Sequence, residues 1–175
     1  MKKRRIGLDI DGVVANFAQA IIDAGHAQGI SGLPEHWHDF TEIYGPRGGK
    51  RSEQHQAFIR VWEKVRDDQD FWDAVPVHEE DAIVPHCYIT ARPAGVDSYL
   101  WLFMNDLPGA PLITVVGSKV EAAKKAGVTL FLDDAPHNLE ELRAAGIECW
   151  LLDRPWNRHH ETPFRVKTIA EILDK

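Results

Sequence analysis

The feature that most constrains the fold is a regular alternation of short apolar runs with amphipathic segments in the second half of the chain. These apolar runs are residues 86–89, 112–116, 129–132 and 148–152. Another short apolar run, at residues 6–10, follows the basic N-terminus. Strands that alternate with helices form parallel sheets that helices cover. The pattern therefore predicts an α/β fold, with a Rossmann-like, three-layer parallel sheet.

Two of the segments between the runs carry helix start and stop signals. In residues 118–127 and 138–146, a Ser or Asn is followed three residues later by Glu, and a Gly ends the segment. This spacing is typical of a helix with a capped N-terminus and a glycine at its C-terminal end. We expect a helix in each segment, beginning at Ser118 and at Asn138.

The segment between the apolar runs at residues 6–10 and 86–89 has a different composition and pattern. A helical pattern begins at Val13, with Phe17 on its apolar face, and a second helix opens at Ser52. The apolar stripe of the second helix contains Phe58, Ile59, Trp62 and Val65. Between the two helices, residues 29–50 are rich in glycine, proline and aromatic side chains. This composition indicates a small helical unit inserted after the first strand.

These boundaries divide the chain into two parts. We expect residues 1–15 and 76–175 to form the α/β core, and residues 16–75 to form a helical cap. A chain of 175 residues is long enough to bury a core of this kind.

Composition excludes several classes of protein. The chain has 20 Lys and Arg against 27 Asp and Glu, a formal charge of −7, which disfavours binding along a long nucleic acid. We found neither a membrane-spanning run of about 18 apolar residues nor a secretory signal. Cys87 and Cys149 both lie in apolar runs, which is typical of buried thiols in a reducing compartment. We therefore expect a cytoplasmic protein.

Polar residues follow four of the predicted strands. They are Asp9 and Asp11, Thr90 to Arg92, Ser118 and Lys119, and Asp133 and Asp134. Ligands of parallel α/β sheets bind at the carboxyl ends of the strands, so these side chains should lie near one another. Several acids, a hydroxyl and a lysine form the set of groups that phosphoryl transfer requires.

The acids point to a divalent cation. Asp9 and Asp11 lie where the first strand ends at Gly12, so the turn can direct both carboxylates to one pocket. Two ionised carboxylates would repel a phosphate, and Mg²⁺, which prefers oxygen ligands, would cancel part of that charge. Asp133 is a natural further ligand, whereas Asp134 fits a ligand and a turn residue equally well.

The remaining strand-end residues suit phosphate binding. Thr90 offers a hydroxyl and a backbone N–H, and Lys119 offers a positive charge. A cation in the first turn of a helix is unfavourable with the helix dipole, which favours a functional role for Lys119. Lys124 and Lys125 are competing candidates, but their mid-helix positions indicate that they face water.

The chain resembles the haloacid dehalogenase (HAD) superfamily of phosphatases. Four signatures of that superfamily occur in order: residues 9–14 (DIDGVV), residues 89–92 (ITAR), Lys119 and residues 131–134 (FLDD). The resemblance implies a phosphatase with a HAD core and covers about residues 6–160.

Within the superfamily, the chain is similar to the 5′(3′)-deoxyribonucleotidase-like branch. The similarity rests on residues 9–17, the Phe71-Trp72 pair and residues 152–157. The cap matches only loosely. The resemblance also implies a possible homodimer.

The resemblance implies a role for each acid. Asp9 would be the nucleophile that forms an aspartyl-phosphate, and Asp11 would protonate the leaving oxygen and then activate water. Mg²⁺ would be held by Asp9, the main-chain carbonyl of Asp11 and Asp133. Asp134 would lie just outside the ligands of the ion or bind it through water.

The same resemblance implies how the phosphate is bound. Thr90, Ala91 and Lys119 would position it, and Arg92 lies close enough in sequence to contact the substrate. The function implied is Mg²⁺-dependent hydrolysis of a small phosphorylated metabolite, with a nucleoside 5′-monophosphate as the first choice. The alternatives are a phosphatase for sugar phosphates or polynucleotide ends, and a catalytically weak nucleotide-binding protein.

Cap aromatics are candidates for stacking on a base. Aromatics at helical spacing belong to a core more often than to a site, so we assign Phe58 and Trp62 to the core. Trp37, Phe40 and Tyr44 stay open as stacking candidates, and so does Trp156, near the strand-end turn at residues 153–155.

Two other patterns are weaker. The histidines at His36, His38, His159 and His160 lack partners at structural-zinc spacing, which indicates loop or surface histidines. The basic loop at residues 45–51 fails the phosphate-loop pattern at two positions. Arg47, Lys50 and Arg51 of that loop therefore either assist phosphate binding or are solvated.

Overall fold

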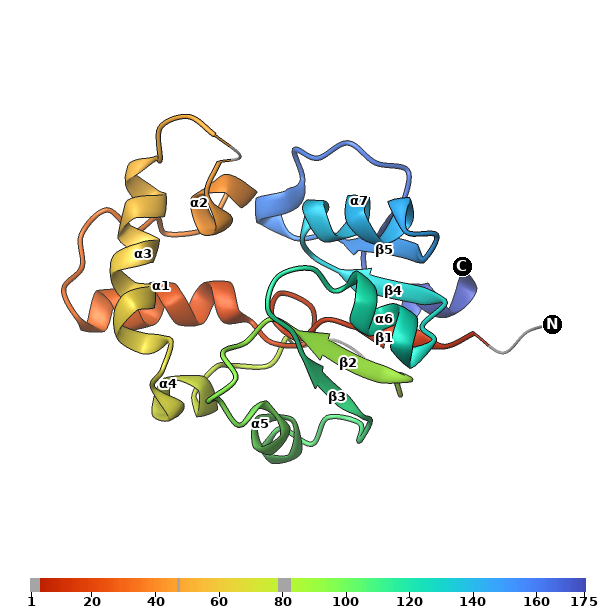
Figure 1. The fold of residues 1–175 in the computed structure, drawn as a ribbon. Coiled ribbons are helices and arrows are strands. Elements are labelled where there is room, and N and C mark those ends of the chain that lie inside the picture. Colours follow the sequence, from red (N-terminus) through yellow and green to blue (C-terminus); the bar gives the residue numbers. More distant parts are fainter. Residues whose placement is uncertain (1–3, 47, 79–82) are drawn as a thin grey trace.

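The computed structural model of the chain describes residues 4–46, 48–78 and 83–175. Its strands are β1 (Ile6–Leu8), β2 (Cys87–Thr90), β3 (Leu112–Thr114), β4 (Leu130–Asp133), β5 (Glu148–Leu152) and β6 (Arg165–Val166). Within the described residues, they form one parallel sheet in the order β3-β2-β1-β4-β5-β6. The predicted α/β class is confirmed (Figure 1).

Helices cover both faces of this sheet, and alternating strand residues show why. On one face, Phe131 and Leu151 pack with the helices α6 (Val120–Ala126) and α7 (Pro136–Ala144). On the other face, Leu130, Leu132 and Leu152 share a core with Trp101 of helix α5 (Ser98–Met104). Strands buried on both faces are apolar throughout, which is why the sequence shows continuous apolar runs.

The expected helix starts at Ser118 and Asn138 are wrong. Lys119 precedes α6, and Ser118 Oγ only accepts a 3.3 Å bond from the Val120 N–H. Helix α7 begins at Pro136, whose fixed φ suits a first helical position, so Asn138 lies inside the first turn. The side chain of Asn138 is then free to take part in the site described below.

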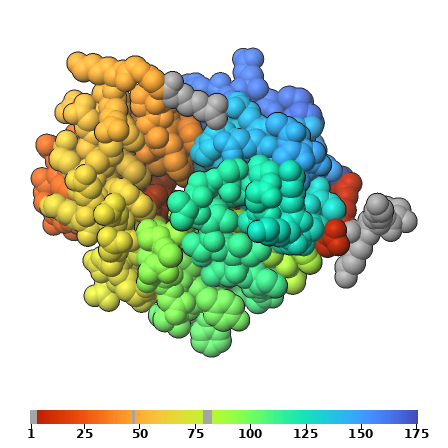
Figure 2. Space-filling model, viewed as in Figure 1, coloured from red at the N-terminus to blue at the C-terminus, as the bar shows by residue number. Residues whose placement is uncertain are grey.

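In the described part of the chain, four helices lie between β1 and β2, and they are called the inserted helices here. They are α1 (Phe17–Ala27), α2 (Phe40–Tyr44), α3 (Glu53–Val65) and α4 (Gln69–Asp73). They lie beside the sheet, past the carboxyl end of β1 (Figure 1). Figure 2 shows a hollow between the inserted helices, in orange and yellow, and the core, in green to blue.

Local hydrogen bonds set the starts of two inserted helices. Ser52 caps α3 by accepting a 3.0 Å hydrogen bond from the His55 N–H, as its position in the sequence predicts. Helix α1 begins at Phe17 and not at Val13, because the backbone N–H groups of residues 13–15 all bond to the Ile10 carbonyl in a tight turn. This turn carries Asp11 and ends β1 at the site.

The C-terminal part of the chain completes the core. The 3₁₀ helices η1 (Pro155–Asn157) and η2 (Ala170–Asp174) flank β6. This strand has two residues and is too short to produce a recognisable sequence pattern. Cys87 and Cys149 are buried free thiols, as predicted. No helix in the described part of the chain is long and apolar enough to cross a membrane.

Candidate active site

The sheet brings the predicted acids together. Strand β1 lies between β2 and β4, with Leu8 opposite Leu132, and the Asp9 N–H donates to the Leu132 carbonyl at 3.0 Å. Asp9 therefore leaves the sheet beside Asp133, which ends β4. The carboxylate of Asp9 also accepts a 2.7 Å hydrogen bond from the Ile10 N–H, which fixes its direction.

Lys119 joins these two acids. Its Nζ lies 2.6 Å from Asp9 Oδ2 and 2.8 Å from Asp133 Oδ2. All three side chains are buried, with exposed fractions of 3% for Lys119, 8% for Asp9 and 0% for Asp133. The rival Lys124 is half exposed and lies 3.7 Å from Glu121 on the outer surface of α6. Of the candidate lysines, the structure brings Lys119 to the acids.

Asp133 is held from a second side by the start of α7. Its Oδ1 accepts from the Ala135 N–H at 2.9 Å, and Asn138 Nδ2 donates to Oδ1 and Oδ2 at 3.1 and 3.0 Å. Anions are favoured at helix N-termini, where backbone N–H groups are unpaired. Sequence reasoning missed this role of Asn138 because the residue resembled a helix cap.

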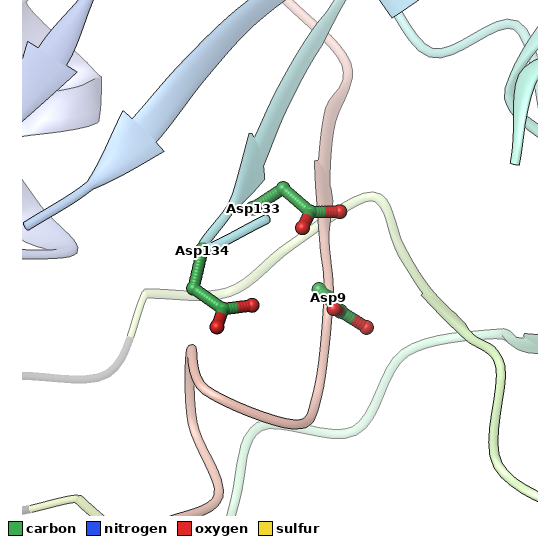
Figure 3. Close-up of side chains that lie close together, drawn as sticks. All are labelled: Asp9, Asp133 and Asp134. Carbon is green, nitrogen blue, oxygen red and sulfur yellow. The ribbon is translucent and has the colours of Figure 1, made fainter. Parts of the chain in front are cut away.

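The two carboxylate oxygens of Asp134 have different surroundings. Its Oδ2 accepts a 2.8 Å hydrogen bond from Trp156 Nε1, while Oδ1 is buried without a hydrogen-bond partner among the described residues. Carboxylate oxygens of Asp9, Asp133 and Asp134 lie within 4.8 Å of one another. Figure 3 shows the three side chains around one space, Asp9 from the end of β1 and the others from the end of β4.

This donor set fits a hard divalent cation. Three convergent carboxylates supply the oxygen ligands that Mg²⁺ and Ca²⁺ take in proteins. The unpartnered Oδ1 of Asp134 is a buried acceptor that a cation would satisfy. The three acids could therefore hold a metal ion.

Burial and mutual repulsion shift the titration of these groups. Burial raises the pKa of Asp9 well above its usual range; Lys119 opposes this shift, and Asp133 and Asp134 add to it. Burial and then Asp133 raise the pKa of Asp134 to about 7, against the Trp156 hydrogen bond. Burial lowers the pKa of the Lys119 ammonium, but the negative charges of Asp133 and Asp9 raise it by more, so the net shift is upward.

Asp11 lies beside this cluster and has a different partner. Arg92 donates to its carboxylate from Nε at 3.0 and 3.1 Å and from Nη2 at 2.8 Å. The sequence predicts a phosphate contact for Arg92, which stays a prediction; in the structure Nε and Nη2 bind Asp11, and Arg92 also lines the cavity described next. Thr90 is buried, and its Oγ1 accepts from the Arg92 N–H at 3.2 Å, while the exposed Ala91 lines the cavity described next.

A cavity of about 340 Å³ opens over the acids. Its polar wall comes from the core and contains Asp9, Asp11, Arg92, Lys119 and Asn138. Its aromatic wall comes from the inserted helices and contains Phe17, Tyr44, Phe58, Trp62 and Trp72. A phosphate bound at the polar wall would thus place the rest of its molecule against aromatic rings.

The expected division of the cap aromatics needs correction. Phe58 and Trp62 pack against the core, as predicted, but both also line the cavity. Trp37 is buried, with its Nε1 donating to the Ala18 carbonyl at 2.7 Å. Tyr44 lines the cavity and stacks on Phe40 with ring centroids 4.3 Å apart. Helical periodicity identifies an apolar face, but it does not tell a core from a cavity.

Two residues that follow β5 form hydrogen bonds to parts of the site. Arg154 donates to the Gly12 and Val13 carbonyls at 2.6 and 3.0 Å and so holds the turn that carries Asp11. Trp156 binds Asp134, so the ambiguity over this tryptophan is resolved in favour of a structural link to the acids. The sequence had already indicated both this tryptophan and the strand-end turn that contains Arg154.

Where the structure describes them, the residues of the weaker sequence patterns lie outside the cavity and the group of acids. In the described part of the chain, the three aspartates are the candidate metal group, and no histidine belongs to it. Lys50 and Arg51 are exposed and do not line the cavity. Arg47 lies outside the described residues.

Several solved structures share this fold. A HAD-superfamily hydrolase of subfamily IA from Geobacter sulfurreducens matches with a TM-score of 0.58 and 16% identity, over 98% of this chain and 95% of that one. A HAD hydrolase from Entamoeba histolytica gives 0.56 and 12%, over 98% of both chains. A putative phosphoglycolate phosphatase from Lactobacillus plantarum gives 0.52 and 15%, over 99% of both chains. The fold is that of the HAD superfamily.

A family model identifies the family to which the chain belongs. The model described as "5' nucleotidase, deoxy (Pyrimidine), cytosolic type C protein" matches residues 3–175. The chain therefore belongs to this family and is an enzyme of the phosphatase class, as the sequence motifs indicate. No curated protein matches the chain significantly.

The raised pKa of Asp134 predicts a pH-dependent stability in metal-free protein. Because the folded-state pKa of about 7 lies above the ordinary 3.8, the stabilising contribution of this acid is present below pH 4 and is lost as the pH rises through 7. Asp134→Asn removes the charge and should raise the free energy of unfolding at pH 8 in chelator by about 1–3 kcal/mol, since one pKa unit is worth about 1.4 kcal/mol.

Chemical denaturation at pH 8 and pH 4 measures this difference. The gain should disappear at pH 4, and Asp23→Asn, a change of the same kind at an exposed position of α1, should change neither value. A metal-free Asp134→Asn protein that is less stable than wild type at pH 8 would contradict the account of this carboxylate.

Proposed function

We propose that this protein is a Mg²⁺-dependent phosphatase that hydrolyses nucleoside 5′-monophosphates through an aspartyl-phosphate intermediate. The observation that carries the proposal is the cluster of Asp9, Asp133 and Asp134, bridged in part by Lys119, beside a cavity with an aromatic wall. Residues 16–75, which contribute that wall, would act as the cap. We also propose a cytoplasmic location, in keeping with the family description; the homodimer stays a prediction from resemblance.

The cation would be held by the carboxylates of Asp9, Asp133 and Asp134, whose oxygens converge. Its chemical contribution is positive charge at a point where an anionic phosphate must approach three acids. Mg²⁺ is the proposed ion because the ligands are all oxygen and the substrate supplies phosphate oxygens. Lys119 adds a second positive charge at the same place.

In the first step, an oxygen of Asp9 attacks phosphorus. The Asp9 O–P bond forms as the bond between phosphorus and the ester oxygen breaks, and Asp11 gives a proton to the leaving oxygen. In the second step, water attacks phosphorus, Asp11 takes its proton, and the Asp9 O–P bond breaks. The sum is one ester and one water converted to one alcohol and one phosphate.

The cavity favours a nucleotide over a sugar phosphate. Phe17, Phe58, Trp62 and Trp72 present ring surface on the side away from the acids, and base stacking on aromatic rings is favourable. A sugar has no aromatic face with which to use this wall. The family description names deoxy and pyrimidine substrates, so a pyrimidine deoxynucleotide is the form we propose first.

Replacing the nucleophile tests the reaction class. Asp9→Asn keeps the shape of the side chain but removes the attacking anion, so hydrolysis of 4-nitrophenyl phosphate should fall at least about 10³-fold. Wild-type activity should also disappear with chelator and return with Mg²⁺. Phosphate release is the measurement, and Asp67→Asn at an exposed position is the matched control. Near-wild-type turnover by Asp9→Asn would refute the assignment.

Shortening the aromatic wall tests the substrate class. In Trp62→Ala, kcat/KM for a nucleoside 5′-monophosphate should fall about 10- to 100-fold, since stacking one base is worth about 1–3 kcal/mol. Glycerol 3-phosphate, which has no base, should lose little in the same variant. Equal losses for both substrates would show that Trp62 supports the fold of the site and does not contact a base.

A further inference from the structure

Arg92 and Asp11 form an ion pair in which two guanidinium nitrogens contact one carboxylate. The Arg92 side chain is 0% exposed, and its Nε and Nη2 bind the carboxylate at 2.8–3.1 Å. Oδ1 of Asp11 accepts from both nitrogens, whereas Oδ2 accepts only from Nε. Two-point contacts of this kind fix the direction of a carboxylate as well as its charge.

The guanidinium itself is held between two tryptophans. Its central carbon lies 4.8 Å from the centroid of Trp72 and 4.5 Å from that of Trp101. Each indole N–H is bonded in turn, Trp72 to the Arg66 carbonyl and Trp101 to the Val75 carbonyl, both at 2.9 Å. Trp72 belongs to the inserted helix α4 and Trp101 to the core helix α5, so the arginine is clamped where the two parts meet.

Trp72 connects the buried Arg92 to the cavity over the acids. Trp72 stacks on Phe17, with ring centroids 5.5 Å apart and planes at 8°, and both rings line the cavity. Phe17, Trp72, Arg92 and Trp101 thus form a continuous set of ring and guanidinium contacts. The Asp11 carboxylate is therefore connected to the aromatic wall through Arg92 and Trp72.

Stability alone does not account for a buried arginine at this place. Its third nitrogen, Nη1, is buried without a hydrogen-bond partner in the part of the chain that the structure describes. Leaving a charged donor unpaired is costly, and apolar groups of similar volume often replace buried ion pairs without loss. The cost indicates that the arginine serves the site.

We propose that Arg92 is a positioning residue that holds the Asp11 carboxyl group where it can pass its proton to the leaving oxygen. The inference rests on the proposed function, in which Asp11 is the acid and base. In the step concerned, the bond from phosphorus to the leaving oxygen breaks, the Asp9 O–P bond forms, and the Asp11 proton moves to the leaving oxygen. Arg92 exchanges no proton and keeps its two-point contact with the resulting carboxylate.

Two substrates with different leaving groups separate positioning from general support of the fold. The alkoxide of a nucleoside 5′-monophosphate needs protonation as it leaves, whereas 4-nitrophenolate is a stable anion and does not. In Arg92→Met, kcat for the nucleotide should fall about 100-fold, the typical cost of misplacing a catalytic group by about 1 Å. KM should stay unchanged, and the first-turnover release of 4-nitrophenolate, which precedes the step in which Asp11 activates water, should slow far less.

A double-mutant cycle shows whether the effect passes through Asp11. Asp11→Asn alone should lower nucleotide turnover about 10²- to 10⁴-fold, the usual contribution of a positioned acid or base. Adding Arg92→Met to Asp11→Asn should cause no further loss if the arginine acts only on that carboxylate. Arg60→Met, at an exposed arginine of α3, is the matched control and should behave as wild type.

Several outcomes would overturn the inference. They are equal losses of the first-turnover rate for both substrates, a further loss in the Asp11→Asn background, and a rise in KM alone, which would indicate a contact with the phosphate. If Arg92→Met does not fold, Arg92→Lys decides, since lysine keeps the charge but loses the two-point contact and should show the same selective loss. A wild-type protein that hydrolyses neither substrate would refute the proposed function, and the inference with it.

Discussion

Lys119 places one ammonium group between two buried carboxylates, 2.6 Å from Asp9 and 2.8 Å from Asp133. Two like charges 4 Å apart repel by about 4 kcal/mol at an effective dielectric constant near 20, and Asp134 adds a third acid to the same space. The carboxyl ends of β1 and β4 meet at this point, so the sheet topology imposes the crowding and Lys119 relieves part of it. The chain carries a charge of −7, and some of that negative charge is concentrated here.

The rest of the site supports this arrangement. The start of α7 and Asn138 bind Asp133, Trp156 binds Asp134, and Arg154 holds the turn that carries Asp11. Each contact fixes a carboxylate or the backbone next to it, yet Asp134 Oδ1 has no hydrogen-bond partner among the residues that the structure describes. A site that is held so firmly and still has an unsatisfied acceptor is well suited to a cation, whose affinity depends on convergent and fixed oxygens.

The sequence predicts the fold class and the principal acids because both follow from local rules. Apolar runs of strand length alternate with helices, and the residues that end parallel strands meet at one edge, so Asp9, Thr90 and Asp133 could be placed without a structure. The same rules fail where the partner is distant in the chain. Asn138 resembled a helix cap, and Arg92 resembled a phosphate ligand because its contact with Asp11 spans 81 residues.

The cavity wall shows the same limit. Phe58 and Trp62 have the spacing of a buried helix face, and the faces of α3 that meet the core and the cavity carry the same kind of residue. Strand β6 has two residues, too few for any period to appear. Periodicity therefore located the elements, while the identity of their neighbours came only from the three-dimensional packing.

The central claim is that Asp9 attacks phosphorus from within this cluster. The most direct measurement is a single turnover of a ³²P-labelled aryl phosphate by the Asp11→Asn variant, in which loss of the water-activating base should slow the second step. After acid quenching and peptide mapping, the account predicts an alkali-labile label on the peptide that contains Asp9. Turnover that leaves the protein unlabelled, or a label on any other residue, would contradict it.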